Sequence, residues 1–350
     1  MNLKKIIAGG AVLLALTTSV FAKTKIVTTI FPEYDWVKEI LGDNLKDTEL
    51  TLLIGNGVDL HSYQPTIKDI AKISTADIFI YVGGESDGWV DGALKNATNK
   101  NMKVINLMEV LGDKVKEEEI VEGMQVEEEE EHEHHHGTDH DEDEDHDHDH
   151  ESEGHHHEGE EGHHHHHHHD EVEYDEHVWL SVRNAKIVCA EICNALCEID
   201  SKNAAAYKAN LVSYSAKLDK LDSDFGTAVK AGKTKTLVFG DRFPFRYFTD
   251  DYGIKYYAAF VGCSAETEAS FETVIFLAQK IDELNLKTVC QIESGNGKIA
   301  RTIIESTKKK NAKILTLDSM QSTTKKDIKK GASYISVMQK NLEVLKQALN

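Results

Sequence analysis

Histidine is the residue type in this chain best suited to chemistry, and its distribution is uneven. Of the 20 histidines, 18 lie between His132 and His169, in an acidic segment that ends in seven consecutive histidines. The other two are His61 and His177. Neutral imidazole is a good ligand for Zn²⁺, so the distribution predicts metal binding. The metal would bind in the histidine-rich segment, at the two separate histidines, or at both.

His61 and His177 are each expected on a loop of a folded part of the chain. His61, in GVDLHSYQP, follows an expected strand over 49–54, and open α/β sheets bind ligands beyond the carboxyl ends of their strands. His177, in EHVWLS, comes directly before an expected helix, for which Ser181 is a plausible N-cap. Either histidine taken alone is more often structural than a ligand. As the only two outside the histidine-rich segment, they predict a shared metal site.

Carboxylates must contribute as well, because two imidazoles do not complete a tetrahedral zinc site. Asp318, in LTLDSMQS, and Asp241, in VFGDRFPF, follow expected strands; we predict Asp318 as the first carboxylate ligand and Asp241 as the second. Glu293, in VCQIESG, is a further candidate with a supporting or structural role. The alternative for each is a loop cap or an ion pair with Arg242 or Arg246.

The elements that must position these residues alternate between strand and helix. Short apolar runs rich in β-branched residues alternate with helix-like stretches, which predicts an α/β fold with parallel sheets. An apolar stripe at heptad spacing predicts one long helix over 203–228 that packs on its own protein. We therefore expect an N-terminal lobe over 23–202, a linker helix over 203–231 and a C-terminal lobe over 232–350. The expected strands are 25–30, 49–54, 77–82, 103–108, 235–240, 287–293 and 313–318.

Residues 1–22 have the layout of a cleavable Sec signal peptide. Two lysines precede an apolar stretch, and the small residues Val20 and Ala22 flank Phe21. A retained membrane anchor is the alternative, but the apolar stretch is short for a span. No cysteine for lipid attachment lies near the expected cleavage point. We expect a soluble, monomeric protein in the periplasm or an equivalent extracytoplasmic space.

The net charge of −22 belongs mainly to one segment. Of the 61 acidic residues, 28 lie between Glu117 and Glu176, where there is no lysine or arginine. Such a segment cannot bury enough apolar surface to fold, so we expect 115–176 to be a disordered loop inserted in the N-terminal lobe. The remaining chain has no basic stripe with interleaved aromatic residues, which excludes nucleic acid as a partner.

The cysteines and the catalytic motifs give no competing site. Cys189, Cys193 and Cys197 recur every four residues, which favours a buried helix face over a metal site. Cys263 and Cys290 could form a disulfide in an oxidising compartment. The chain lacks HExxH, GxSxG, GxGxxG and P-loop motifs, so we do not expect an enzyme.

Three stretches, LHSYQPTIKDIAKISTADIFIYVG, EHVWLS and NAAAYKAN, resemble one known family. Over essentially the whole mature chain, the sequence resembles the zinc and manganese solute-binding proteins of bacterial high-affinity ABC importers. The resemblance implies two Rossmann-like lobes joined by one rigid helix, a single metal in the cleft between them, and an ABC permease in the cytoplasmic membrane as partner. It implies His61 and His177 as ligands and Asp318 as the C-terminal carboxylate, with Tyr63 and Trp179 beside the ligands.

One position departs from the family pattern. The third ligand of the family precedes an FxYF-like segment; aligned on Phe245 and Tyr247, it falls on Arg242, which cannot bind a cation. Asp241, one residue earlier, is the chemically possible substitute. The ligand types allow Zn²⁺ or Mn²⁺. Long histidine-rich loops accompany zinc in this family, so the resemblance favours Zn²⁺, with the loop as an accessory collector. A manganese receptor and an exported zinc buffer are the alternatives.

Overall fold

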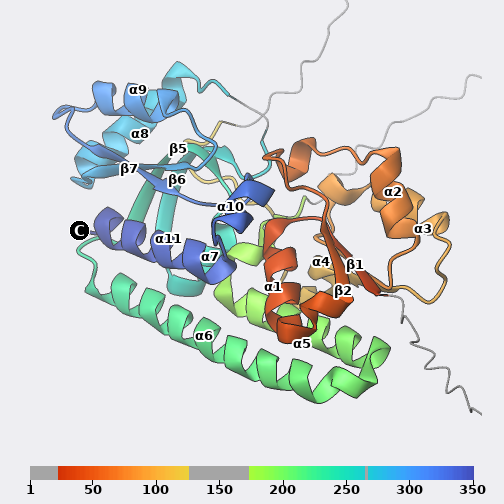
Figure 1. Ribbon diagram of the computed structural model, residues 1–350. Helices are drawn as coiled ribbons and strands as arrows, with labels where there is room; N and C mark the ends of the chain where they lie inside the picture. The colour runs from red at the N-terminus through yellow and green to blue at the C-terminus, as the bar shows by residue number, and fades with distance from the viewer. Residues whose placement is uncertain (1–22, 126–172, 265–266) are drawn as a thin grey trace, which may run out of the picture. The chain divides into compact units, whose positions relative to one another are not determined.

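The computed structural model describes residues 23–125, 173–264 and 267–350, which form two compact units. Unit 1 comprises the described residues of 23–114, 178–231 and 318–345, and unit 2 those of 115–177, 232–317 and 346–350. Each unit contains one parallel sheet of four strands (Figure 1). The predicted α/β fold is therefore confirmed. The expected signal peptide and the 18 clustered histidines lie outside the described residues.

The sheet of unit 1 has the strand order β2-β1-β3-β4, with every pair parallel. Apolar β-branched residues such as Ile26 and Ile78 are fully buried because helices cover the sheet. The strands are β1 (Thr24–Thr28), β2 (Thr48–Leu52), β3 (Ile78–Tyr81) and β4 (Lys103–Asn106). The helices are α1 (Phe31–Leu41), α2 (Ile67–Ser74), α3 (Val90–Lys95), α4 (Leu107–Leu111), α5 (Val182–Ile199), α6 (Ala204–Ala231), α10 (Lys325–Lys329) and most of α11 (Tyr334–Ala348). Short 3₁₀ helices lie at η1 (Gly42–Asp47), η2 (Leu60–Ser62), η3 (Glu85–Asp87), η4 (Gly112–Lys114), η5 (Val178–Leu180) and η6 (Ser201–Asn203).

The long helix α6 packs along α5 and α1 of its own unit (Figure 1). Its predicted stripe is buried at Tyr207, Tyr214 and Phe225, so the heptad spacing marks an intramolecular face. The preceding helix α5 begins after Ser181, whose hydroxyl accepts the main-chain N–H of Asn184 at 3.0 Å. This N-cap satisfies one of the amides that have no partner inside the helix. Both the long helix and the Ser181 cap are confirmed.

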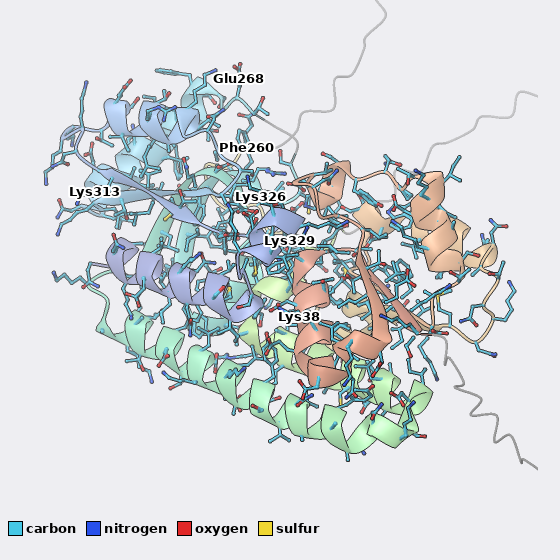
Figure 2. All side chains as sticks on the ribbon, viewed as in Figure 1. Lys38, Phe260, Glu268, Lys313, Lys326 and Lys329 are labelled. Atoms are coloured by element: carbon cyan, nitrogen blue, oxygen red, sulfur yellow. The ribbon has the colours of Figure 1, made fainter. Side chains whose placement is uncertain are left out.

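The sheet of unit 2 has the strand order β6-β5-β7-β8 and is also parallel. Helices α8 and α9 pack against each other and against the central strands. Phe260, labelled in Figure 2, lies in the core that they cover. The strands are β5 (Thr236–Phe243), β6 (Lys255–Val261), β7 (Thr288–Ile292) and β8 (Lys313–Leu317), and the helices are α7 (Arg246–Tyr252), α8 (Phe271–Glu283) and α9 (Lys298–Ser306).

Three features differ from the sequence expectations. Strand β6 was not predicted, and the expected strand over 103–108 ends at Asn106, where the side chain caps α4. The ends of the expected loop are ordered: Glu118 N–H donates to Glu173 O at 2.8 Å, and Asp175 N–H to Lys116 O at 2.9 Å. Each unit is built from several separate segments of the chain, and the predicted division into lobes by chain order stays a prediction.

Among the described residues, no helix combines the length and apolarity needed to cross a membrane.

Candidate metal centre

His177 is fully buried in unit 2, and one carboxylate fixes its ring. Asp175 Oδ1 accepts the main-chain N–H of His177 at 2.8 Å and lies 3.0 Å from its Nδ1. The main chain of Asp175 is itself held, because the Tyr247 hydroxyl donates to its carbonyl at 2.6 Å. A carboxylate oxygen accepts hydrogen bonds, so it favours the tautomer with the proton on Nδ1, in which Nε2 carries the lone pair that a metal ligand needs.

Cys263 lies beside this histidine. The ligand atoms of His177 and Cys263 lie within 4.8 Å of each other. The preceding residue is Gly262, where an added Cβ would lie 2.9 Å from His177 Cε1 and 3.0 Å from Phe243 O. Only glycine therefore lets the ring approach this strand end. The Cys263 N–H donates to Glu118 Oε1 at 3.3 Å, which fixes the main chain at the thiol.

Burial and nearby negative charges favour the protonated form of the Cys263 thiol when no metal is bound. Burial raises the pKa of this thiol well above its usual range, and the negative charges of Glu118, Asp175 and Glu176 raise it further. The thiolate is the form that ligates metals, so a bound cation has to displace the thiol proton.

His61 lies in unit 1, on the 3₁₀ helix η2. The Asp59 side chain accepts its main-chain N–H at 3.1 Å, and its Nδ1 lies 2.7 Å from the Ser86 hydroxyl. Its Nε2 faces the amide nitrogen of Gln321 at 3.5 Å. The ring is thus oriented through Nδ1, as a ligand histidine is, and a metal at Nε2 would require the Gln321 amide to move aside.

Asp318 begins the loop in unit 1 that also carries Gln321. The Asn341 side chain of α11 makes two 2.8 Å hydrogen bonds to the main chain of Asp318: it donates to the Asp318 carbonyl and accepts the Asp318 N–H. Asp318 Oδ1 accepts the N–H of Met320, which has a φ of 64°, a left-handed conformation that costs energy in a residue other than glycine. Trp179 Nε1 donates to the Ser319 carbonyl at 2.9 Å, so Trp179 holds this loop in place.

Asp241 lies in β5, where the pairing with β6 shifts register. Its Oδ1 accepts the N–H of Arg242 at 2.9 Å and its Oδ2 accepts the N–H of Ile292 at 3.2 Å. Burial raises the pKa of Asp241, while these two hydrogen bonds oppose the rise. Asp241 thus has the contacts of a strand-end cap. The suggested partner Arg246 instead forms an ion pair with Glu119.

Sequence reasoning overlooked Cys263 as a ligand candidate. The signal that could have found it is a thiol that follows the run KYYAAFV after a single glycine, and the structure shows this run as β6. Cys263 and Cys290, considered as a disulfide, are both free thiols, and Cys290 is buried in β7. Tyr63 packs edge-on against Trp89 at 6.0 Å between ring centroids, and its expected place beside the metal ligands stays a prediction. A ligand role for Glu293 stays untested.

Comparison with known proteins gives a consistent result. Residues 26–348 match the family model described as "Zinc-uptake complex component A periplasmic". The zinc-binding lipoprotein AdcA of Streptococcus pneumoniae strain R6 is 32% identical over 326 residues, which cover 93% of this chain and 56% of AdcA. The high-affinity zinc uptake system protein ZnuA of Bacillus subtilis is 29% identical, covering 93% of this chain and 88% of that protein.

A solved structure agrees with these sequence relatives. The Zn(II)-bound ZnuA-like domain of Streptococcus pneumoniae AdcA matches with a TM-score of 0.64 and 26% identity, covering 93% of this chain and 99% of the domain. The chain spans about half the length of the AdcA proteins it matches. Proteins of this family are solute-binding proteins rather than enzymes, in agreement with the absence of catalytic motifs. The chain belongs to the zinc-uptake complex component A periplasmic family.

Proposed function

We propose that this protein is an extracytoplasmic receptor that binds Zn²⁺ tightly and delivers it to an ABC importer. The observation that carries the proposal is the buried His177 ring, whose Nδ1 lies 3.0 Å from Asp175 Oδ1, an arrangement that favours the lone pair for a metal on Nε2. A buried histidine with a carboxylate at one nitrogen is the arrangement that protein zinc sites use to orient a ligand.

We assign His61 as the second imidazole ligand. Its Nδ1 is engaged by the Ser86 hydroxyl, so His61 and His177 would both bind through Nε2. Asp318 is the proposed carboxylate, since Asn341 and Trp179 brace the loop that carries it. Asp241 stays the predicted third ligand from the sequence, although its two oxygens already accept main-chain N–H groups.

The proposed partner is a permease in the cytoplasmic membrane, because the family takes part in zinc uptake and a solute-binding protein needs a transporter to release its cargo to. The histidine-rich segment is proposed as an accessory collector. Many imidazoles and carboxylates on one tether give weak, exchangeable sites and raise the zinc concentration near the tight site.

Growth of the source cell in zinc-depleted medium tests the receptor against the alternative of an exported buffer. Cells that carry only the His177→Ala protein should fail to accumulate zinc and should regain growth when zinc is added. The Asp219→Asn protein, changed at an exposed ion pair with Lys186, should support normal growth. Normal zinc uptake with His177→Ala, together with sensitivity to excess zinc, would favour a buffer instead.

A further inference from the structure

We propose that the Cys263 thiolate, rather than Asp241, is the ligand that accompanies His177, and that this sulfur makes the site selective for Zn²⁺ and softer cations over Mn²⁺. The inference rests on the proposed function and names the chemistry of the same site. It departs from the sequence prediction, in which Asp241 supplies this ligand.

The geometry of the pair suits one tetrahedral cation. Zinc bonds of about 2.1 Å to nitrogen and about 2.3 Å to sulfur place the two ligand atoms roughly 3.6 Å apart at a tetrahedral angle. The ligand atoms of His177 and Cys263 already lie within 4.8 Å of each other. Closing this separation by at most about 1.2 Å would bring the two atoms to the spacing that the two bonds require.

The surroundings fix both ligands before a metal arrives. Cys263 follows the carboxyl end of β6, and Glu118 accepts its main-chain N–H. Gly262 removes the Cβ that would collide with the His177 ring, and Asp175 holds the ring through Nδ1. These contacts belong to one compact unit, so the pair is preorganised by its own fold.

Asp241 has a different role in the same unit. Each of its carboxylate oxygens accepts a main-chain N–H, from Arg242 and from Ile292, and an added Cβ on Gly295 would lie 2.2 Å from Oδ2. A carboxylate packed this closely between two strands caps them. Turning it toward a metal would take the acceptors away from two part-buried main-chain donors.

Ligand softness gives the expected selectivity. Thiolate ligands favour zinc and softer cations, whereas Mn²⁺ prefers carboxylate, carbonyl and water oxygens. Cys263→Ser should therefore weaken zinc binding by more than about 100-fold, in line with the loss of a ligand. Cys263→Asp should lower the ratio of zinc to manganese affinity at least tenfold. An unchanged ratio in Cys263→Asp would overturn the selectivity.

Titration of the full chain with Co²⁺ alone tests the ligand directly. A cobalt–thiolate bond gives a near-ultraviolet charge-transfer band, and the histidine-rich segment contains no cysteine that could produce one. The wild-type protein should show the band at one equivalent of metal. Asp241→Asn and the matched thiol control Cys290→Ser should retain it, and Cys263→Ser should lose it. Cys263→His, which keeps a ligand, should bind zinc tightly without the band.

The outcomes separate this inference from the proposed function. A tight cobalt site without the charge-transfer band, or a band that survives Cys263→Ser, would overturn Cys263 as a ligand and leave the zinc receptor standing. Absence of any tight zinc or cobalt site in the wild-type chain would contradict the receptor itself.

Discussion

At the scale of single residues, the proposed role of each histidine as a zinc ligand depends on how its ring is held. His177 is oriented by Asp175 through Nδ1, and His61 by Ser86 through the same atom. The Asp175 carboxylate only accepts, so it favours the proton on His177 Nδ1, whereas the Ser86 hydroxyl can donate or accept and orients the His61 ring without fixing its tautomer. The two neighbours differ in charge. A carboxylate raises the basicity of a ligand histidine more than a hydroxyl does, so we expect His177 to be the stronger ligand.

Replacing Asp175 tests this orientation. In Asp175→Asn the side chain keeps its shape but loses its charge, so the His177 ring should be held less firmly and be less basic. We expect zinc affinity to fall by about 10–100-fold, as for other outer-shell changes, measured by competition with a chelator. Asp219→Asn, at a position whose side chain is 60% exposed, is the control and should leave affinity unchanged. Equal affinities in the two variants would show that Asp175 does not position the ligand.

Zinc affinity should also be sensitive to a single methyl group added at Gly262. An alanine Cβ would lie 2.9 Å from the His177 ring, so Gly262→Ala should displace the ring and reduce zinc affinity at least about tenfold. Gly226→Ala, in α6 where an added Cβ meets nothing within 4 Å, is the matched control. The control should bind zinc as the wild type does. Calorimetric titration of both variants checks the difference, and a tight site in Gly262→Ala would refute the packing argument.

At the scale of elements, helix α11 is attached to α1 by a buried acid. Asp35 Oδ2 accepts the Tyr334 N–H at 2.8 Å, and Tyr334 packs edge-on against Trp36 at 5.3 Å between ring centroids. The acid thus occupies the amino end of α11, where the helix dipole favours negative charge. Burial nevertheless raises the pKa of Asp35 from 3.8 to about 6.

This raised pKa predicts how stability depends on pH. Between about pH 4 and pH 6 the folded protein keeps the Asp35 proton while the unfolded chain has released it, so the free energy of unfolding falls as pH rises. The Asp35 contribution to this fall should be about 2–3 kcal/mol. Asp35→Asn keeps an acceptor for Tyr334 and should remove that contribution. Denaturant unfolding of both proteins at pH 4 and pH 7 measures this contribution. The same change in the free energy of unfolding between the two pH values in both proteins would contradict a raised pKa of Asp35.

The elements also show what could be predicted from the sequence. Local signals placed α5 and α6 well, because the Ser181 cap and the Tyr207–Phe225 stripe depend on neighbouring residues only. Strand β6 was missed, and with it the thiol of Cys263 that follows it. Cys263 and His177 lie far apart in the chain, and the residues that hold them, Glu118 and Asp175, flank the antiparallel bridge between Glu117 and Tyr174. No local pattern encodes such a contact.

At the scale of the whole molecule, the histidine-rich segment is inserted between two anchored ends. Glu117 and Tyr174 form an antiparallel bridge, and Gln125 N–H donates to Ala259 O at 2.9 Å. Residues on both sides of the insertion are therefore held by main-chain contacts, and Asp175 and Tyr247, which hold His177, lie outside it. We expect the fold to form without the histidine-rich segment.

Deleting residues 126–172 and joining the ends with a short Gly-Ser linker tests this separation. Loop-closure entropy varies only slowly with length, so the free energy of unfolding should change by less than about 1 kcal/mol. Several weak zinc sites should disappear while one tight site remains. Loss of cooperative unfolding would show that the insertion supports the fold, which the contacts at its ends do not suggest.

The most direct test of the receptor is the zinc stoichiometry of this shortened chain and of its His61→Ala and His177→Ala variants, measured by competition with a chelator of known affinity. We predict one tight equivalent in the shortened chain and a loss of more than about 100-fold in affinity in each variant, because each removes a ligand. Tight binding that persists in both variants would place the metal elsewhere and contradict the assignment of His61 and His177.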